Sequence, residues 1–309
     1  MVMNEASLPN SRAREPMQTL KIGTRTSPLA MAQAKEVQSR LAAAFPDVAT
    51  EIVGMNTRGD TFLGQPLAEI GGKGLFTKEI EDALLDGRID LAVHSMKDVP
   101  TVLPEGLIMG AILPREDARD YLVGRWRSLA ELPKGAKFGT SSLRRAAQVL
   151  MVRPDIEILP LRGNVQTRLK KLEEGLMDAT MLALAGLNRL GLAQVPGAPL
   201  EISECLPAIA QGAIGIECRE SDEVLRENLA LINCKNSFIA TECERAFLRV
   251  LDGSCRTPIA GHAQIHGQEL HFSGLLVEPD GKNPKTVEIT GSVADAAVLG
   301  RQAGQKLKA

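Results

Sequence analysis

Apolar residues are spaced in two ways along this chain, and each spacing predicts a different element. From residue 240 to residue 251 they recur on one face at helical spacing, and Cys243 lies on that face. Residues 89–93 and 213–216 instead form short apolar runs, which are typical of buried strands. Strand, polar turn and helix then follow one another in both halves of the chain. This order predicts an α/β protein.

The two halves resemble each other in sequence. Lys21-Ile22-Gly23-Thr24 and Lys137-Phe138-Gly139-Thr140 both come before a polar turn and an Ala-rich segment that contains glutamine. Later in each half, residues 87–93 resemble residues 175–181, each with a glycine turn before an apolar run. A repeat of this kind predicts two structurally equivalent units.

Both polar turns carry helix-start residues. Ser27 is a good N-cap and Pro28 suits the first helical position, so we expect a helix that ends near Ala44. In the second half, Ser141 or Ser142 can cap a helix with Arg144 and Arg145 in its first turn. Arginine disfavours that end of a helix, so the pair favours a bound anion. A solvated helix start with surface arginines is the alternative.

Basic residues gather at the predicted strand-to-helix junctions. In open α/β sheets these junctions line the ligand crevice, and arginine clamps carboxylates or phosphates with two hydrogen bonds. The pattern therefore predicts a cleft for a small polyanion between two α/β lobes. Its arginines are Arg25, Arg144, Arg145, Arg162 and Arg168.

An acid is predicted at the same rim. The apolar run at 89–93 leads through His94 into Lys97 and Asp98, at the carboxyl end of a strand. A carboxylate among cations can carry a proton or stabilise a developing cation. The alternative for Asp98 is an ordinary turn residue. His94 is expected to be a packed residue, and the other three histidines have no partners at ligand spacing in the sequence.

Cys255 lies in the turn Gly253-Ser254-Cys255-Arg256, outside any apolar run. A neighbouring cation favours the thiolate, which is the reactive form of cysteine. The alternative is an inert thiol that packs as a small hydrophobe, as we expect for Cys218 and Cys243. No CxxC pair or Cys/His group has zinc spacing, so we expect no metal site.

Composition narrows the possible partners. The 309 residues carry a net charge of -2 and only 3% aromatic residues, which argues against nucleic-acid binding. No apolar run approaches the length of a membrane span, and the first twenty residues lack the apolar core of a signal peptide. We expect residues 1–16 to be a disordered extension. Five cysteines without an export signal indicate a reducing cytoplasm.

The glycine-rich segment Gly71-Gly72-Lys73-Gly74 is not a nucleotide-binding loop. Lys73 is followed by glycine instead of serine or threonine, and the glycine five residues upstream is missing. We interpret it as a mobile flap that presents one basic residue.

Together these motifs resemble those of the hydroxymethylbilane synthases, also called porphobilinogen deaminases. The resemblance covers roughly residues 19–290, and the ordered set is far more specific than any one motif. The matching motifs are Gly23-Thr24-Arg25-Thr26-Ser27-Pro28-Leu29-Ala30, Thr57-Arg58-Gly59-Asp60, Gly71-Gly72-Lys73-Gly74-Leu75-Phe76, His94-Ser95-Met96-Lys97-Asp98-Val99-Pro100, Gly139-Thr140-Ser141-Ser142-Leu143-Arg144-Arg145, Leu161-Arg162-Gly163-Asn164-Val165-Gln166-Thr167-Arg168, Gln211-Gly212-Ala213 and Gly253-Ser254-Cys255.

The resemblance implies a fold of two periplasmic-binding-protein-like α/β lobes with mixed sheets and a small C-terminal α+β domain. The chain would cross between the lobes twice. The expected divisions are residues 17–114 with 213–232 for the first lobe, 118–207 for the second, and 235–309 for the domain that anchors the cofactor.

The resemblance also implies a reaction. Four porphobilinogen units would be deaminated and joined head to tail on a dipyrromethane cofactor, which Cys255 holds through a thioether bond. Water would then release the linear tetrapyrrole hydroxymethylbilane. A monomer without nucleic-acid or membrane partners is expected. The competing functions are a two-lobed binding protein without catalysis and a thiol-dependent acyl transferase that uses Cys255.

Residue roles follow from the same resemblance. Asp98 would be catalytic. The cofactor contacts, beside Cys255, would be Ser95, Lys97, Thr140, Ser142, Arg144, Arg145, Arg162 and Gln211. The substrate contacts would be Arg25, Ser27, Lys73, Arg162 and Arg168.

Overall fold

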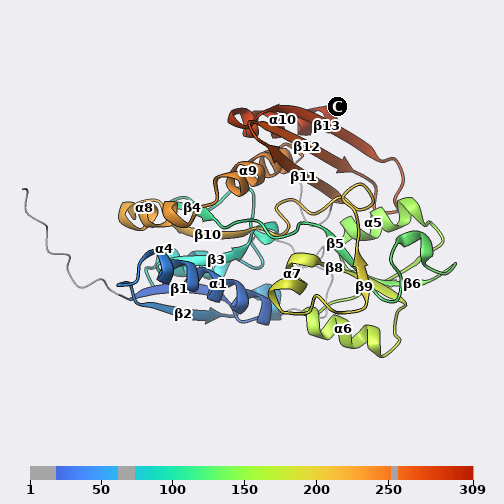
Figure 1. Ribbon diagram of the computed structural model, residues 1–309, viewed down its shortest axis with the longest axis horizontal. Coiled ribbons are helices and arrows are strands. Elements are labelled where there is room, and N and C mark those ends of the chain that lie inside the picture. The colour runs from blue at the N-terminus through green and yellow to red at the C-terminus, as the bar shows by residue number, and fades with distance from the viewer. Residues whose placement is uncertain (1–18, 62–73, 252–256, 309) are drawn as a thin grey trace, which may run out of the picture.

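The computed structural model describes residues 19–61, 74–251 and 257–308. Within these residues the strands form two five-stranded sheets and one three-stranded sheet. Figure 1 shows them as three bodies, each with its own helices. The predicted disordered extension at 1–16 lies outside the described residues.

The first lobe is built on a mixed sheet of strand order β2-β1-β3-β10-β4. Strands β1, β2 and β3 run parallel, whereas β10 is antiparallel to both of its neighbours. The strands are β1 (Leu20–Arg25), β2 (Thr50–Met55), β3 (Leu91–Ser95), β4 (Leu107–Ile112) and β10 (Ile214–Arg219). The helices are α1 (Pro28–Ala44), α2 (Arg58–Thr61), α4 (Lys78–Leu85) and α8 (Glu223–Ile232).

The second lobe has a sheet of the same design, with strand order β7-β6-β8-β5-β9. Here β5 is the strand that runs antiparallel to both neighbours. The strands are β5 (Asp120–Val123), β6 (Lys137–Gly139), β7 (Glu157–Leu159), β8 (Ala179–Ala183) and β9 (Gly197–Pro199). The helices are α5 (Leu143–Val152), α6 (Val165–Glu173) and α7 (Leu184–Arg189).

The predicted repeat is confirmed by matching hydrogen bonds at the start of both sheets. The amide of Lys21 donates to Oδ2 of Asp90 at 2.8 Å, and the amide of Lys137 donates to Oδ2 of Asp178 at the same distance. In both pairs the aspartate amide donates back to the lysine carbonyl. The two segments therefore occupy equivalent places in the two lobes.

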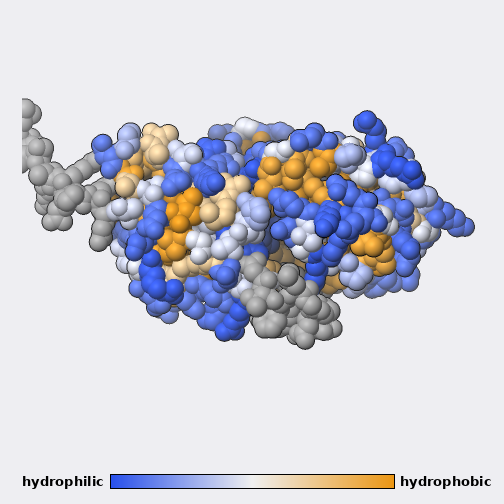
Figure 2. All heavy atoms as spheres, turned by 90° about the horizontal axis from the view of Figure 1, so that it is seen from below, coloured by the Kyte–Doolittle hydropathy of each residue, from blue (hydrophilic) through white to orange (hydrophobic). Residues whose placement is uncertain are grey.

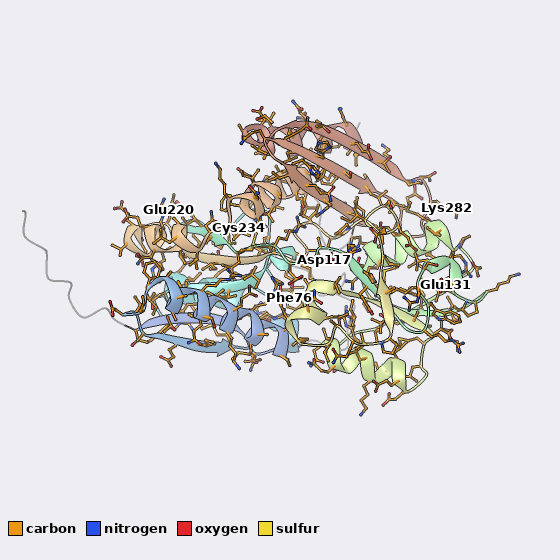
Figure 3. The ribbon with its side chains drawn as sticks, in the orientation of Figure 1. Phe76, Asp117, Glu131, Glu220, Cys234 and Lys282 are labelled. Atoms are coloured by element: carbon orange, nitrogen blue, oxygen red, sulfur yellow. The ribbon has the colours of Figure 1, made fainter. Side chains whose placement is uncertain are left out.

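The chain crosses between the lobes twice, as predicted. Residues 113–119 lead from β4 of the first sheet into β5 of the second, and residues 200–213 lead from β9 back to β10. Asp117, on the first crossing, lies near the centre of the view in Figure 3. Each lobe thus contains one strand that follows directly from the other lobe. The lobes also touch where Arg189 of α7 forms an ion pair with Glu36 of α1 at 3.2 Å.

The C-terminal domain packs two helices on an antiparallel sheet of order β11-β12-β13. Its elements are α9 (Lys235–Val250), β11 (Ile259–His266), β12 (Glu269–Leu276), β13 (Lys285–Ser292) and α10 (Ala296–Lys308). Phe247 of α9 stacks against Phe272 of β12, with ring centroids 4.9 Å apart. The same core includes Met96 and Val99 of the first lobe, so the domain packs on the first lobe through apolar contacts.

The predicted fold class is confirmed: two α/β lobes with mixed sheets and a small α+β domain. The face in Figure 2 has separate apolar areas among hydrophilic side chains. Among the described helices, none is both long enough and apolar enough to span a bilayer.

Candidate active site

The helix starts predicted from the sequence are present. Oγ of Ser27 accepts the amide of Ala30 at 3.3 Å at the start of α1, and Pro28 occupies the first turn. At the start of α5, Oγ of Ser142 accepts the amide of Arg145 at 3.5 Å. Both caps satisfy amides that would otherwise lack partners. Helix α1 begins after the carboxyl end of β1, and helix α5 begins after the carboxyl end of β6. The polar side chains of the site gather at these strand ends.

Arg144 and Arg145 meet an anion inside the protein. Each guanidinium lies 2.7 Å from a different carboxylate oxygen of Asp120, the first residue of β5. Nε2 of Gln211 donates to the same carboxylate at 3.0 Å. Burial alone would raise the pKa of Asp120, but the two guanidiniums outweigh it and hold the pKa well below its usual range.

This Asp120 cluster changes what the sequence pattern means. The anion inferred at the start of α5 is at least partly a carboxylate of the protein itself. It joins the second lobe to Gln211, which lies on the returning crossing. Contact of either arginine with a bound cofactor stays a prediction.

Asp98 lies in a short 3-10 helix, Met96–Asp98, directly after β3. Lys97 is exposed to water, yet surrounding protein removes enough hydration to lower its pKa to about 8. The charge of Asp98 opposes that shift, while Arg145 adds to it. Burial similarly lowers the pKa of Arg168 to about 10; Arg145 adds to the shift and Asp98 opposes it. The charge of Asp98 therefore acts on cations from both lobes, Lys97 of the first and Arg168 of the second.

The Asp98 cluster, which consists of Asp98, Lys97, Arg162 and Arg168, contains three cations that have few partners. Within the described residues, Lys97 and Arg162 make no hydrogen bond or ion pair, and Arg168 donates only to the carbonyl of Gly163, at 2.8 Å. The field of Arg162 also helps to lower the pKa of Arg168. Gathering like charges is costly unless an anion neutralises them. This geometry suits a ligand with several carboxylates.

The remaining predicted residues have more varied surroundings. Oγ of Ser95 shares hydrogen bonds with the side chain of Gln33, at 2.9 and 3.0 Å. Oγ1 of Thr140 accepts the amide of Ser142 at 3.1 Å. The guanidinium of Arg25 lies 4.3 Å from the ring centroid of Phe76, which is labelled in Figure 3.

Gln211 is almost fully buried, and its Oε1 has no hydrogen-bond partner among the described residues. Such an acceptor is costly unless a donor reaches it, so it is suited to an N–H group of a ligand. Lys73 and Cys255, also predicted for the site, lie outside the described residues. Their placement stays a prediction.

Sequence reasoning missed Asp120 and Gln33. Asp120 stands at the head of the apolar run Tyr121–Val123, after a charged segment. An acidic residue at the start of a predicted buried strand is the signal that could have drawn attention to it. Gln33 lies in the helical segment of the repeat, and no feature of the sequence pairs it with Ser95.

Other nucleophiles and bases have structural surroundings. Burial raises the pKa of Cys205 and Cys243 to about 12 and that of Cys218 to about 11, so these thiols stay protonated at neutral pH. His94 is buried as expected, with Nε2 2.9 Å from Oε2 of Glu217. His262 has no partner at ligand spacing in the sequence, but the fold places it 3.5 Å from Glu244, which lies on another element.

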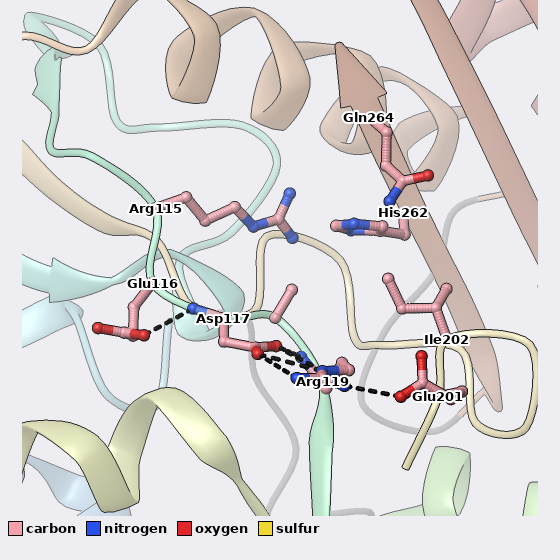
Figure 4. A pocket seen from close by; sticks show the side chains of 9 residues that line it. Arg115, Glu116, Asp117, Arg119, Glu201, Ile202, His262 and Gln264 are labelled. Atoms are coloured by element: carbon pink, nitrogen blue, oxygen red, sulfur yellow. Dashed lines mark hydrogen bonds and ion pairs between the residues drawn. The ribbon is translucent and has the colours of Figure 1, made fainter. Parts of the chain in front are cut away.

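A separate cavity of about 450 Å³ lies at the first crossing between the lobes (Figure 4). Its two arginines are already paired: Arg119 contacts Asp117 at 2.9 Å and Glu201 at 2.7 Å, and Arg115 contacts Glu244 at 2.6 Å. These pairs leave no excess of cations for an anionic ligand. The Asp98 cluster is therefore the better candidate for the active site.

Comparison with known proteins identifies the family. Residues 20–227 match the family described as "Porphobilinogen deaminase, dipyromethane cofactor binding domain". Residues 238–309 match "Porphobilinogen deaminase, C-terminal domain". The chain belongs to the porphobilinogen deaminase family. It is an enzyme family whose first matched domain is named for binding a dipyrromethane cofactor.

A curated member of the deaminase family is closely similar to this chain. It is "Porphobilinogen deaminase, chloroplastic" from Oryza sativa subsp. japonica, which is 52% identical over 307 residues, covering 97% of this chain and 86% of the relative. The cytoplasmic location expected from the sequence is not confirmed by this relative.

Solved structures with a similar arrangement include two binding proteins. The periplasmic aliphatic sulphonate binding protein SsuA from Escherichia coli gives a TM-score of 0.39 at 19% identity, covering 75% of this chain and 70% of that one. The "probable amino-acid ABC transporter extracellular-binding protein ytmK" from Bacillus subtilis gives a TM-score of 0.41 at 13% identity, covering 70% of this chain and 90% of that one. At these TM-scores the likeness adds nothing to the functional argument.

The residues present fit the cofactor that characterises the deaminase family. A dipyrromethane carries carboxylates and pyrrole N–H donors. Lys97, Arg162 and Arg168 supply cations with few partners, and Oε1 of Gln211 is a buried acceptor without one among the described residues. The three cations therefore suit the carboxylates of the cofactor, and the Gln211 acceptor suits its pyrrole N–H groups.

Proposed function

We propose that this chain is a hydroxymethylbilane synthase, a transferase (EC 2.5.1.61) that joins four porphobilinogen molecules head to tail with release of ammonia. Water then releases the linear tetrapyrrole hydroxymethylbilane. The observation that carries the proposal is the Asp98 carboxylate, which lies directly after a strand beside Lys97 and interacts electrostatically with Arg168 of the other lobe. Membership of the deaminase family supports the same reaction.

Asp98 is the catalytic residue of this proposal. Loss of ammonia from porphobilinogen requires proton transfer to the leaving amine and leaves an electron-poor pyrrolic cation. The carboxyl group can donate that proton, and the carboxylate that remains can stabilise the cation. The charges of Lys97 and Arg168 interact with the carboxylate of Asp98, and these two residues bind substrate carboxylates on either side of it.

The basic residues bind and orient the carboxylates of the growing chain. Each pyrrole unit carries an acetate and a propionate, so every added unit brings two further anions into the cleft. We assign substrate binding to Arg25, Ser27, Lys73, Arg162 and Arg168. We assign cofactor binding to Ser95, Lys97, Thr140, Ser142, Arg144, Arg145, Arg162 and Gln211.

Cys255 is the proposed anchor, and its thiol forms a thioether once, when the cofactor is attached. When bound, the dipyrromethane supplies the free pyrrole position to which the first substrate unit is joined. The nearest histidine in the sequence, His262, lies 3.5 Å from Glu244, and no motif pairs it with Cys255 as a base that would activate the thiol on each turnover. This fits an anchor better than a nucleophile that reacts in every cycle.

The division of the chain is also proposed: residues 17–114 with 213–232, 118–207 and 235–309. We further propose a monomer in the cytoplasm, without nucleic-acid partners. Light scattering after gel filtration tests the first property, since a dimeric mass contradicts it. Cell fractionation tests the second, and an organellar location contradicts it.

Intact mass and turnover together test the function. Protein from cells that make porphobilinogen should exceed the polypeptide mass by two pyrrole units, and Cys255→Ser should lack this adduct. Asp98→Ala should keep the adduct and the fold but lose more than about 100-fold in turnover. The exposed Asp47→Ala is the matched control and should leave turnover unchanged.

Two results contradict the proposal. A clean polypeptide mass together with no hydroxymethylbilane from porphobilinogen favours the two-lobed binding protein. Full turnover in Asp98→Ala removes Asp98 from the mechanism.

A further inference from the structure

Two arginines of the C-terminal domain bind the backbone just after Asp98. Arg245 donates from Nη1 to the carbonyl of Val99 at 3.1 Å and from Nη2 to that of Pro100 at 2.6 Å. Arg249 donates from Nη2 to the carbonyl of Thr101 at 2.5 Å. The two arginines are one turn apart on α9, so they lie on the same face of the helix. Three consecutive carbonyls are thus bound to one helix.

The same turn is held by apolar contacts. Met96 lies directly before Lys97 and Asp98, and Val99 lies directly after them. Both apolar residues are buried in the core that contains Phe247 of α9. The amide of Met96 also donates to the carbonyl of Ala213, directly before β10, at 3.0 Å. The turn that carries Asp98 is therefore fixed between the first lobe and the C-terminal domain.

Arg245 keeps its charge in unfavourable surroundings. Among the described residues it forms no ion pair with a carboxylate, and burial lowers its pKa to about 10. Arg249 adds to that shift and Glu217, which lies against His94, opposes it. A guanidinium can reach two carbonyls at once in a fixed geometry, which a lysine ammonium cannot reproduce. Burying the Arg245 guanidinium without a carboxylate partner costs stability. A role in fixing the position of the turn that carries Asp98 explains why it is placed there.

We propose that Arg245 and Arg249 are positioning residues for Asp98. They fix the turn that carries Asp98 to helix α9 of the C-terminal domain, so that the carboxylate keeps one position while the cleft between the lobes accommodates a longer chain. The inference rests on the proposed function, because it concerns the residue that the proposal makes catalytic.

The test compares Arg245→Gln, Arg245→Lys and Arg249→Gln in the full-length protein carrying its cofactor. Arg226→Gln is the matched control, since Arg226 also donates to a backbone carbonyl, that of Glu220 at 3.0 Å, but on α8. Misplacement of a catalytic group by about 1 Å can cost about 100-fold in rate. We expect kcat to fall about 10- to 100-fold in Arg245→Gln, while KM for porphobilinogen changes less than about twofold.

Milder variants should show graded effects. Arg245→Lys should recover part of the loss, and Arg249→Gln should lower kcat about 2- to 10-fold because it removes one hydrogen bond. Arg249 is exposed, so Arg249→Gln should fold, and its kcat tests the proposal even if Arg245→Gln fails to fold. Intact mass should show the two-pyrrole adduct in each folded variant. Hydrogen exchange should speed up at the amides of Met96 and Val99 in the variants but not in the control.

Two outcomes overturn the inference. Normal kcat with faster exchange at Met96 and Val99 shows that the turn needs no positioning by α9. An equal loss of kcat in Arg226→Gln shows a general effect of removing arginine. Failure of the unsubstituted protein to make hydroxymethylbilane is a different result, because it contradicts the proposed function itself.

Discussion

Arg115 and Glu244 form a buried ion pair, with 2.6 Å between Nη1 and Oε1, that joins the first crossing between the lobes to helix α9. The Glu244 carboxylate also accepts the amides of Ala210 at 2.5 Å and Ala263 at 2.8 Å. Burial alone would raise the pKa of Glu244, but Arg115 and His262 lower it to about 2. This carboxylate thus ties both crossings to the C-terminal domain.

Glu244→Ala should lower the free energy of unfolding by about 3–5 kcal/mol, because it leaves Arg115 buried without its partner. Glu242→Ala, at an exposed position of the same helix, should change it by less than about 0.5 kcal/mol. Urea denaturation measures both. Similar values for the two variants would show that the ion pair does not stabilise the fold.

The same carboxylate predicts acid sensitivity. Its pKa in the folded state lies below the ordinary 4.5, so its contribution is complete above about pH 4.5 and is lost as the pH falls towards 2. Thermal melting between about pH 6 and pH 3 should show a steeper loss of stability in the unsubstituted protein than in Glu244→Gln. Parallel curves would argue against this assignment.

Arg168→Leu and Arg145→Leu should differ in stability but not in their effect on chain growth. Arg145→Leu removes both hydrogen bonds that Arg145 donates to the buried Asp120 carboxylate and should cost about 1.5–3 kcal/mol or more. Arg168→Leu loses one bond to a carbonyl and should cost about 1 kcal/mol or less. Both should trap enzyme-bound intermediates, visible by intact mass. Product formation at the normal rate in either variant contradicts its role in binding carboxylates.

Binding of porphobilinogen should weaken as the pH rises through about 8. Lys97, whose pKa is lowered to about 8, is cationic below that pH and neutral above it. The pH dependence of KM measures this loss of one positive charge. Lys97→Arg should flatten the profile because arginine stays charged throughout. An unchanged profile in Lys97→Arg would assign the dependence to another group.

Gly212→Ala should destabilise the returning crossing. Gly212 has φ +88°, and an added Cβ would lie 2.5 Å from the carbonyl oxygen of Glu116 on the other crossing. Gly135 has φ +69° with open space around the added Cβ. Gly135→Ala should therefore cost about 1 kcal/mol, and Gly212→Ala clearly more. Equal losses in a urea titration would show that the close approach is relieved by small shifts.

Local signals in the sequence determined much of the fold. Ser27 with Pro28 and Ser142 mark helix starts because a hydroxyl at an N-cap satisfies amides of the first turn. The repeated Lys-x-Gly-Thr segments correctly indicated two equivalent lobes, and the strand-end position of Asp98 placed it at a rim. These features depend on residues close to one another in the chain, so they can be read without a structure.

The tertiary structure alone decided which charges meet. Arg144 and Arg145 share Asp120 because the chain crosses into the second lobe at β5, and Arg245 reaches the turn after Asp98 because the C-terminal domain packs on the first lobe. Neither partner is marked by local spacing. Lys97, Arg162 and Arg168 are left with few partners for the same reason: the crossings bring the acidic residues to other cations. Pairing of charges depends on long-range packing, and the cations that packing leaves over form the candidate site.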